Sequence, residues 1–341
     1  MLTNDLHFDL PADLIAQTPA DQRDHSRLMV LDPPAQSIDH RQFYDICDYL
    51  NDGDVLVLNN TKVMNARLKG HKLTGARIEC FLIDEVEHNV WTCLMKPTKR
   101  IREGDIIEFS GNIKAEVINK GERCTLKFLI SDSITHHLEH IGEPPLPPYI
   151  KSENPHAFSK RYQTVFAQHT GSVAAPTAGL HFTEELMTKL RYKGIKIEYV
   201  TLHVGYGTFQ NIQSEQLTDH DMHYESYSID EDVAERLNDY KQQKQRIISV
   251  GTTSTRTLES ATVDGYVQAG SNKSNLFIYP GYTFKFIDGM ITNFHLPKSS
   301  LLALVSALAG LPFILKAYRE AIQQQYRFYS FGDAMFIQRL L

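Results

Sequence analysis

Six short β-rich runs with no long helix between them constrain the fold of this 341-residue chain more than any other feature. The runs cover residues 66–68, 77–83, 90–95, 106–109, 113–118 and 124–130. Turn pairs such as Thr74-Gly75 and Lys120-Gly121 separate them. Short strands at this spacing are typical of a small barrel or sandwich. The proline-rich segment GEPPLPPYI, residues 142–150, then predicts a stiff connector.

Strands and helices alternate on both sides of this block, which is typical of an α/β domain with a largely parallel sheet. We expect strands at residues 28–31, 54–58, 196–202, 247–250 and 276–279, and helices at residues 40–50, 184–193, 230–243, from 301 and from 315. Thr183 is placed to begin the second helix and Gly194 to end it. The β-rich block therefore reads as an insertion, with residues 1–61 and 150–341 forming the α/β domain and residues 62–149 the all-β domain.

The stretch at residues 279–301 combines turn, strand and polar signals. Residues 283–286 and 290–294 predict a hairpin with Asp288-Gly289 at its tip. Asn293, His295 and Lys298 follow, and Ser299 and Ser300 can cap the helix that opens at Leu301. Open α/β sheets bind ligands where strands give way to helix N-termini, so we expect a site here.

Composition is that of an ordinary globular protein, with 42% hydrophobic and 22% charged residues. A net charge of −6 does not point to nucleic acid, but a local basic face can still bind it. Four scattered cysteines and a start without a basic, apolar leader predict reduced thiols in the cytoplasm. The most apolar window, residues 301–315, is shorter than the roughly 20 residues that span a bilayer, so no membrane association is expected.

Two further motifs are rich in glycine. AAPTAGLHF covers residues 174–182, and HVGYGTF covers residues 203–209. The second lacks the third glycine of a dinucleotide fingerprint. Gly205 and Gly207 instead allow a ligand close to the backbone, with Phe209 available to stack on a flat ring; an ordinary turn is the alternative.

DHDMHYE, residues 219–225, places carboxylates and imidazoles close together. Asp219, His220 and His223 suit proton transfer, which needs a group that titrates near neutrality. A metal is the less favoured interpretation, because no further ligands occur at a recognisable spacing. We therefore predict no metal.

Two other stretches favour anions. VGTTSTRTLES, residues 250–260, places Thr252 and Thr253 where a strand ends and a helix begins, with Arg256 one turn later. Such a helix start can hold a carboxylate or phosphate, although simple N-capping is the plainer interpretation. KPTKRIR, residues 96–102, is basic and predicts either a solvated hairpin or contact with phosphates.

Together these motifs resemble the S-adenosylmethionine:tRNA ribosyltransferase-isomerase family of queuosine biosynthesis. The resemblance extends almost end to end, through FDLP, IAQTP, SRL, LNNTKV, KPTKR, LPPYI, RYQTVF, AAPTAGLHF, HVGYGTF, DHDMH, VGTTSTRTLE, PGYTF, TNFHLPKSSL and YRFYSFGDAM. Pro144 stands where the family has Met, and Tyr206 where it has a small or aliphatic residue.

The resemblance implies an α/β domain with an inserted six-strand antiparallel barrel. It also implies that the ribosyl group of S-adenosylmethionine moves to 7-aminomethyl-7-deazaguanine at the tRNA wobble position, giving epoxyqueuosine with release of adenine and methionine. S-adenosylmethionine is then a substrate, and neither a cofactor nor an obligate protein partner is expected.

A base that removes a C5′ proton beside the sulfonium is required, together with an acid for the departing adenine, a holder for the methionine carboxylate and a guard against water. Candidates for proton transfer are His203, Asp219, His220, His223 and His295. Predicted substrate-binding residues are Thr177, Gly179, His181, Phe182, Gly205, Gly207, Phe209, Thr252, Thr253, Arg256, Asn293 and Lys298. Predicted tRNA-binding residues are Lys96, Lys99, Arg100 and Arg102.

Two other classes of protein remain as alternatives. An S-adenosylmethionine-dependent methyltransferase would want a glycine-rich loop after its first strand, and none is found. A non-catalytic tRNA-binding protein could use the basic loop and the barrel, but it would not need five polar loop clusters in the α/β half.

Overall fold

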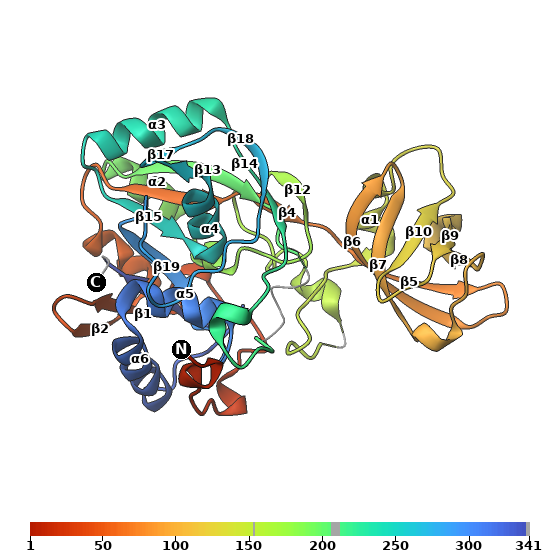
Figure 1. The fold of residues 1–341 in the computed structure, drawn as a ribbon, viewed down its shortest axis with the longest axis horizontal. Helices are drawn as coiled ribbons and strands as arrows, with labels where there is room; N and C mark the ends of the chain where they lie inside the picture. Colours follow the sequence, from red (N-terminus) through yellow and green to blue (C-terminus); the bar gives the residue numbers. More distant parts are fainter. Residues whose placement is uncertain (153, 206–211, 339–341) are drawn as a thin grey trace.

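The computed structural model describes residues 1–152, 154–205 and 212–338. In these residues a mixed nine-stranded sheet flanked by helices forms the larger region, and a closed antiparallel barrel lies to one side of it (Figure 1). This is the predicted architecture of an α/β region with an inserted all-β region.

The large sheet has a parallel centre and antiparallel edges. Its order is β18 (Gly270–Ser274), β14 (Glu225–Ile229), β13 (Lys196–Leu202), β3 (Val55–Asn59), β15 (Ile247–Val250), β19 (Gly289–Asn293), β20 (Ala334–Ile337), β1 (Arg27–Asp32) and β2 (Ser37–Gln42). The four neighbours β13, β3, β15 and β19 are parallel, as is the pair β20 and β1. β19 and β20 pair antiparallel, so two parallel groups of strands meet at this pair.

Alternate residues of the central strands enter two separate cores, because successive side chains of a strand point to opposite faces. Val55 and Val57 face one core, whereas Leu56 and Leu58 face the other. The first core is covered by α3 (Glu231–Gln242), α4 (Gly251–Ala261), α5 (Ser300–Ala309) and α6 (Leu311–Gln323). The second is covered by α2 (Glu184–Tyr192) and the 3₁₀ segments η4 (Phe43–Tyr49) and η9 (Thr177–His181).

The predicted helix starts at Thr183 and Ser299 are confirmed, whereas the last helix begins at Leu311 rather than at residue 315. Thr183 accepts a hydrogen bond from the Leu186 N–H at the start of α2, and Ser299 accepts one from Leu302 at the start of α5. Gly310, at φ 81°, separates α5 from α6. No single helix among the described residues is long and apolar enough to cross a membrane, and α5 and α6 meet the criterion only as a pair bent by 113°.

The barrel is built from six strands in the predicted order along the chain. They are β5 (Arg67–Lys72), β6 (Arg77–Glu87), β7 (Val90–Lys96), β8 (Ile106–Phe109), β9 (Lys114–Asn119) and β10 (Cys124–Phe128). Pairing of β5 with β8 closes the barrel. The short helix α1 (Leu138–Ile141) follows β10 in the chain, and the short strand β11 (Gly142–Glu143) after it pairs with β5. Val173 of the α/β region packs into the barrel core.

Two small ribbons complete the strands. β4 (Thr61–Val63) leads into the barrel and pairs in parallel with β12 (His169–Ser172), and β16 (Thr262–Val263) pairs with β17 (Tyr266–Val267). The boundaries of the two domains, residues 62–149 for the insertion, stay a prediction.

The hairpin predicted at residues 283–294 is wrong. Residues 283–286 form no strand, because the buried carboxylate of Glu259 accepts the backbone N–H groups of Lys285, Phe286 and Ile287. Gly289 is not a turn residue but the first residue of β19, where an added Cβ would lie 2.8 Å from the Gln338 carbonyl oxygen. The glycine thus permits close strand approach.

Two smaller expectations are also wrong. Residues 276–279 are irregular, and the strand before them is β18 at the sheet edge. The predicted helix at residues 40–50 is instead the end of β2 followed by the 3₁₀ segment η4, because residues 37–42 pair with β1.

Candidate active site

A cavity of about 850 Å³, including its open mouth, lies at the carboxyl ends of the parallel strands β15 and β19. We call it the strand-edge cavity. It is lined by Tyr149, Tyr162, Ala174, Ala175, Pro176, Thr177, Ala178, Val204, Gly251, Thr252, Thr253, Thr292, Asn293, Phe294, His295, Leu296, Ser299, Leu301, Tyr329 and Ser330.

The start of α4 forms one side of this cavity. Gly251, at φ +87°, turns the chain from β15 into the helix, a conformation that residues with a Cβ rarely adopt. The N-cap residue Val250 has no side-chain acceptor, so no side chain of that residue caps the first-turn N–H groups. Thr252 and Thr253 line the cavity, and the Thr253 hydroxyl is buried without a hydrogen-bond partner in the part of the chain that the structure describes. This combination suits an anionic ligand group.

The end of β19 forms a second side. His295 Nε2 lies 2.9 Å from the Thr292 hydroxyl, and burial lowers the pKa of His295 to about 3. Its imidazole is therefore neutral at pH 7, and burial also makes it a weaker base than an exposed histidine. Asn293 donates to the Tyr329 carbonyl oxygen at 3.2 Å, while its own Oδ1 is buried and has no partner within residues 1–152, 154–205 and 212–338.

An aromatic wall, formed by Tyr149, Tyr162 and Tyr329, was not predicted. The ring centroids of Tyr149 and Tyr329 lie 4.2 Å apart, and the Tyr149 hydroxyl is 2.5 Å from the Ser330 hydroxyl. Burial raises the pKa of Tyr149 and Tyr162, so both phenols stay protonated. The motifs LPPYI, RYQTVF and YRFYSFGDAM contain these residues, and their aromatic character was the signal available in the sequence.

Three predicted substrate-binding residues in or next to η9 pack beside the cavity but are not among its lining residues: Gly179, His181 and Phe182. Phe182 is buried against Phe43, and an added Cβ on Gly179 would meet Phe166 at 2.8 Å. His181 is 2.7 Å from the Ser26 hydroxyl through Nδ1 and 3.1 Å from Asn293 Nδ2 through Nε2. Among the substrate-binding residues predicted between positions 177 and 182, Thr177 lines the cavity directly.

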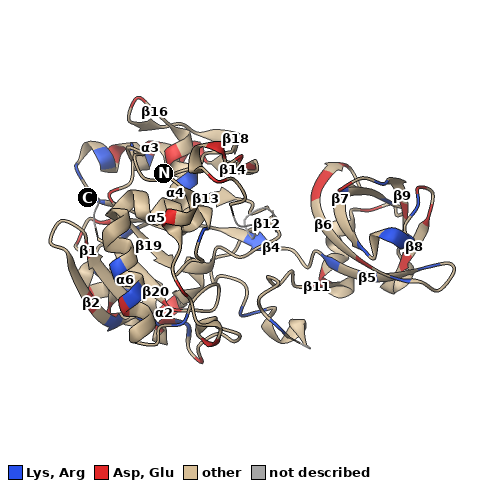
Figure 2. Cartoon of the chain, turned by 60° about the horizontal axis from the view of Figure 1, so that its bottom comes forward, with Lys and Arg blue, Asp and Glu red and all other residues tan. Residues whose placement is uncertain are grey.

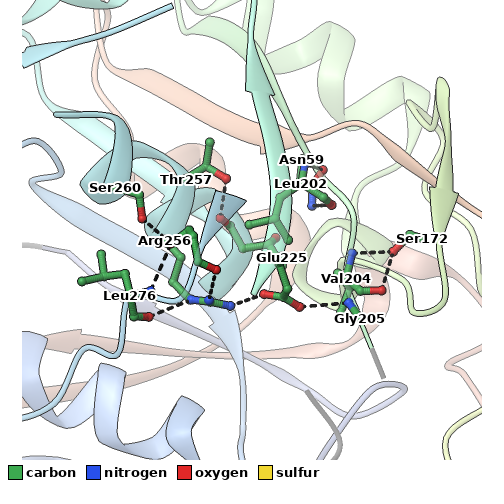
Figure 3. A network of polar contacts seen from close by, with 12 residues as sticks. Asn59, Ser172, Leu202, Val204, Gly205, Glu225, Arg256, Thr257, Ser260 and Leu276 are labelled. Carbon is green, nitrogen blue, oxygen red and sulfur yellow. Dashed lines mark hydrogen bonds and ion pairs between the residues drawn. The ribbon is translucent and has the colours of Figure 1, made fainter. Parts of the chain in front are cut away.

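Gly205 and Arg256 belong to a separate cluster, which we call the Glu225 network (Figure 3). One oxygen of Glu225 accepts the Gly205 N–H at 3.0 Å, and the other accepts from Arg256. Arg256 also donates to the carbonyl oxygens of Leu276 at 3.1 Å and Ser274 at 3.4 Å. The carboxylate that Arg256 binds in this structure is thus that of Glu225, and its contact with a ligand carboxylate stays a prediction.

The other proton-transfer candidates do not line the strand-edge cavity. His203 Nδ1 lies 2.8 Å from the Thr61 hydroxyl, and burial, then nearby His169, lowers its pKa. His220 packs its ring edge-to-face on Phe277, and burial, then His223, lowers its pKa. Asp219 ends the 3₁₀ segment η11 (Leu217–Asp219), and His223 lies between it and β14. Of the five candidates, all within the described residues, His295 alone lines the cavity.

Two predicted residues, Gly207 and Phe209, lie outside the described residues, as does Tyr206. Lys298 precedes α5 with φ 58°, and its backbone N–H donates to the Leu6 carbonyl oxygen. Its neighbour Ser299, rather than Lys298, is part of the cavity wall.

The sequence matches the queuosine biosynthesis protein family over residues 3–337. This chain belongs to that family. It is also similar to the crystal structure of an S-adenosylmethionine tRNA ribosyltransferase from Thermotoga maritima, with 37% identity and a TM-score of 0.57. The match covers 98% of this chain and 99% of the other.

The basic loop of this family member lies on the barrel. Lys99 and Arg100 are exposed in the 3₁₀ turn η5 (Thr98–Arg100), with Lys96 and Arg102 exposed on either side. Figure 2 shows lysine and arginine interspersed with acidic residues over both regions rather than gathered on one side. Contact of this loop with tRNA stays a prediction.

No group of three or more His, Cys, Asp or Glu side chains arranged to hold a metal ion occurs within the described residues. The absence of a metal stays a prediction.

Proposed function

We propose that this chain transfers and isomerises the ribosyl group of S-adenosylmethionine onto 7-aminomethyl-7-deazaguanine at the tRNA wobble position. The products are epoxyqueuosine in tRNA, adenine and methionine. One observation carries the proposal: in a member of this family, the strand-edge cavity combines a helix N-terminus, an aromatic wall and unpaired buried polar atoms.

The parts of the cavity fit the parts of S-adenosylmethionine. The start of α4, with Thr252 and Thr253, offers N–H and hydroxyl groups to the methionine carboxylate. Tyr149 and Tyr329 offer ring faces to a sulfonium cation or to a flat base. Asn293 Oδ1 is free to accept a hydrogen bond from a ribose hydroxyl or the incoming amine.

His295 is the residue best placed to move the proton. It would take a C5′ proton, which the adjacent sulfonium acidifies. Adenine would then leave C1′ with the bonding electrons and take up a proton from a general acid, so that neutral adenine is released. The tRNA amine captures the ribose fragment, and methionine departs as the epoxide closes. Burial of His295 keeps water from competing for the proton.

The proposal also covers cofactors, partners and the cellular compartment. S-adenosylmethionine is consumed as a substrate, and no cofactor, metal or obligate protein partner takes part. The reaction takes place in the cytoplasm.

The experiment is incubation with precursor-bearing tRNA and S-adenosylmethionine labelled either in the ribose or in the methyl group. Ribose label should enter tRNA while adenine and methionine are released in equal amounts, and tRNA with ordinary guanine should take up no label. Entry of methyl label would make the protein a methyltransferase. Binding of tRNA with neither label transferred would make it a binding protein.

A further inference from the structure

A second cavity, of about 280 Å³, adjoins the strand-edge cavity. We call it the arginine cavity, because three arginines from distant parts of the chain meet in its wall. It is lined by Pro19, Ala20, Arg23, Ser26, Arg161, Leu180, His181, Arg327, Ser330, Phe331 and Gly332. None of these lining residues is acidic, so the wall carries a local positive charge in a protein whose net charge is −6.

Backbone carbonyl groups hold these arginines in place without neutralising them. Arg23 donates to the carbonyl oxygens of Leu180 at 3.1 Å and Gln163 at 2.8 Å. Arg161 donates to those of Ala20 and Asp21 at 2.6 and 3.0 Å. These bonds fix the direction of each guanidinium and do not cancel its formal charge. Burial lowers the pKa of Arg161, and the nearby Asp21 carboxylate opposes that shift.

The nearest carboxylates are only weakly available to the cluster. Asp333 lies 3.8 Å from Arg327, but both of its oxygens already accept backbone N–H groups, those of Arg27 at 2.9 Å and Arg327 at 2.7 Å. The Asp21 side chain is exposed. In addition, Arg161 Nε is buried without a hydrogen-bond partner among the described residues.

Two residues connect the arginine cavity to the strand-edge cavity. Ser330 lines both. His181 lines the arginine cavity and contacts Asn293 of the strand-edge cavity at 3.1 Å. A nucleotide whose base enters the strand-edge cavity would therefore carry its flanking phosphates toward the arginines.

We propose that the arginine cavity binds a backbone phosphate of the tRNA beside the nucleotide under modification. This inference rests on the proposed function in taking tRNA as the substrate. Guanidinium groups bind phosphate oxygens with paired N–H donors, and such contacts fix the register of a nucleic acid on a protein. The methionine carboxylate of S-adenosylmethionine is the other anion in the reaction, and the experiment separates the two.

The variants are Arg327→Gln and Arg161→Gln, with Arg327→Lys retaining the charge. Arg319→Gln removes the same charge from an exposed arginine of α6 that lines neither cavity. Binding of an anticodon stem-loop is measured as a function of salt, and the KM for S-adenosylmethionine is measured in parallel. Thermal unfolding of each variant is recorded alongside.

Each Gln variant should bind the stem-loop about tenfold more weakly, as expected for a lost charge-assisted contact. The slope of log K against log salt should fall by about 0.7 for one single-strand phosphate. Arg327→Lys should retain most of the slope, Arg319→Gln all of it, and the KM for S-adenosylmethionine should stay unchanged.

A second readout uses the wild-type protein, so it does not depend on a variant that folds. Stem-loop should protect Arg161 and Arg327 from phenylglyoxal, whereas S-adenosylmethionine alone should not. Unchanged salt slopes in both Gln variants, no protection by the stem-loop, or a rise in KM for S-adenosylmethionine alone would overturn the inference.

The two proposals can fail separately. Ribosyl transfer by a wild-type enzyme whose Gln variants keep their salt slopes would contradict the arginine cavity alone. Loss of slope in the variants of a protein that binds tRNA but transfers no ribosyl group would contradict the proposed function alone.

Discussion

The strand-edge cavity and the Glu225 network share helix α4 but differ in how their buried polar groups are satisfied. In the cavity, Thr253 Oγ1 and Asn293 Oδ1 are buried without a partner among the described residues. In the network, Arg256 is held by a carboxylate and two carbonyl oxygens. A buried polar atom without a partner costs free energy, so a cluster of them at one cavity indicates a ligand site. A cluster whose polar groups are all hydrogen-bonded within the protein indicates a role in holding the fold together.

The largest expected effect tests the scaffold side of this comparison. Side-chain exposure is 6% for Arg256 and 4% for Glu225, so Arg256→Ala would leave a carboxylate buried without its cation. We expect the free energy of unfolding to fall by about 3–5 kcal/mol, measured by urea denaturation. The double variant Arg256→Met with Glu225→Gln should recover part of this loss, because neither charge remains. A stable Arg256→Ala protein with only a raised KM for S-adenosylmethionine would instead make Arg256 a ligand-binding residue.

The next effect tests the catalytic side. His295→Ala should lower kcat by roughly a hundredfold or more with little change in KM, because the proton moves only in the transition state. His220→Ala, outside the cavity, serves as the matched control and should retain nearly full activity. If the two variants behaved in the opposite way, the base would lie in the loop at residues 219–225. Deuterium exchange at C5′ would locate it.

A third prediction compares buried and half-buried histidines through pH. Burial lowers the pKa of His295 to about 3, and burial, then Arg327 and Arg23, does the same for His181. In the unfolded chain these histidines take up a proton near pH 6.5. Their contribution to the free energy of unfolding is therefore fully present above that pH and is lost as the pH falls toward 3. From pH 7 to 5 the loss should be on the order of 2 kcal/mol per histidine.

Urea denaturation at the two pH values measures this loss. His181→Gln should reduce it, whereas His220→Gln should leave most of it. An equal free energy of unfolding at pH 7 and pH 5 would mean that neither histidine is buried in its neutral form.

The smallest effect contrasts two threonines of α4. Thr253→Val removes a hydroxyl that has no partner, so the free protein should keep its stability or gain up to about 1 kcal/mol while binding S-adenosylmethionine more weakly. Thr257→Val removes a hydroxyl that donates to the Thr253 carbonyl oxygen at 3.0 Å, so it should cost about 0.5–1.5 kcal/mol and leave binding unchanged. Urea denaturation and S-adenosylmethionine titration measure the two quantities. Equal behaviour of both variants would remove the distinction between unpaired and paired hydroxyls.

The sequence predicted the parts of the fold that depend on interactions between residues close together in the chain. The barrel strands follow from alternating β-rich runs, and the starts of α2 and α5 follow from Thr183 and Ser299. The hairpin at residues 283–294 failed because Glu259, far away in the sequence, takes the backbone donors that a strand would have used. Asp288-Gly289 has turn chemistry, but tertiary packing places Gly289 in a central strand.

The site shows the same division. The strand-to-helix junctions at Thr252 and Asn293 could be predicted because parallel strands bring their carboxyl ends to one edge. The contact of Tyr149 with Ser330 spans 181 positions, and no local pattern encodes such a distance. The contact of Arg256 with Glu225 could not be predicted for a related reason, since Glu225 lies on another element.

The central claim is that the strand-edge cavity holds S-adenosylmethionine, and equilibrium dialysis with labelled S-adenosylmethionine tests it most directly. Thr252 is partly exposed in the cavity wall, so Thr252→Phe should fill the cavity without disturbing the core. Thr188→Phe places the same ring on the exposed side of α2 as a control. With both variants melting near the wild-type temperature, Thr252→Phe should lose binding at least tenfold and Thr188→Phe should bind normally. Unchanged binding by a folded Thr252→Phe protein would contradict the assignment of this cavity.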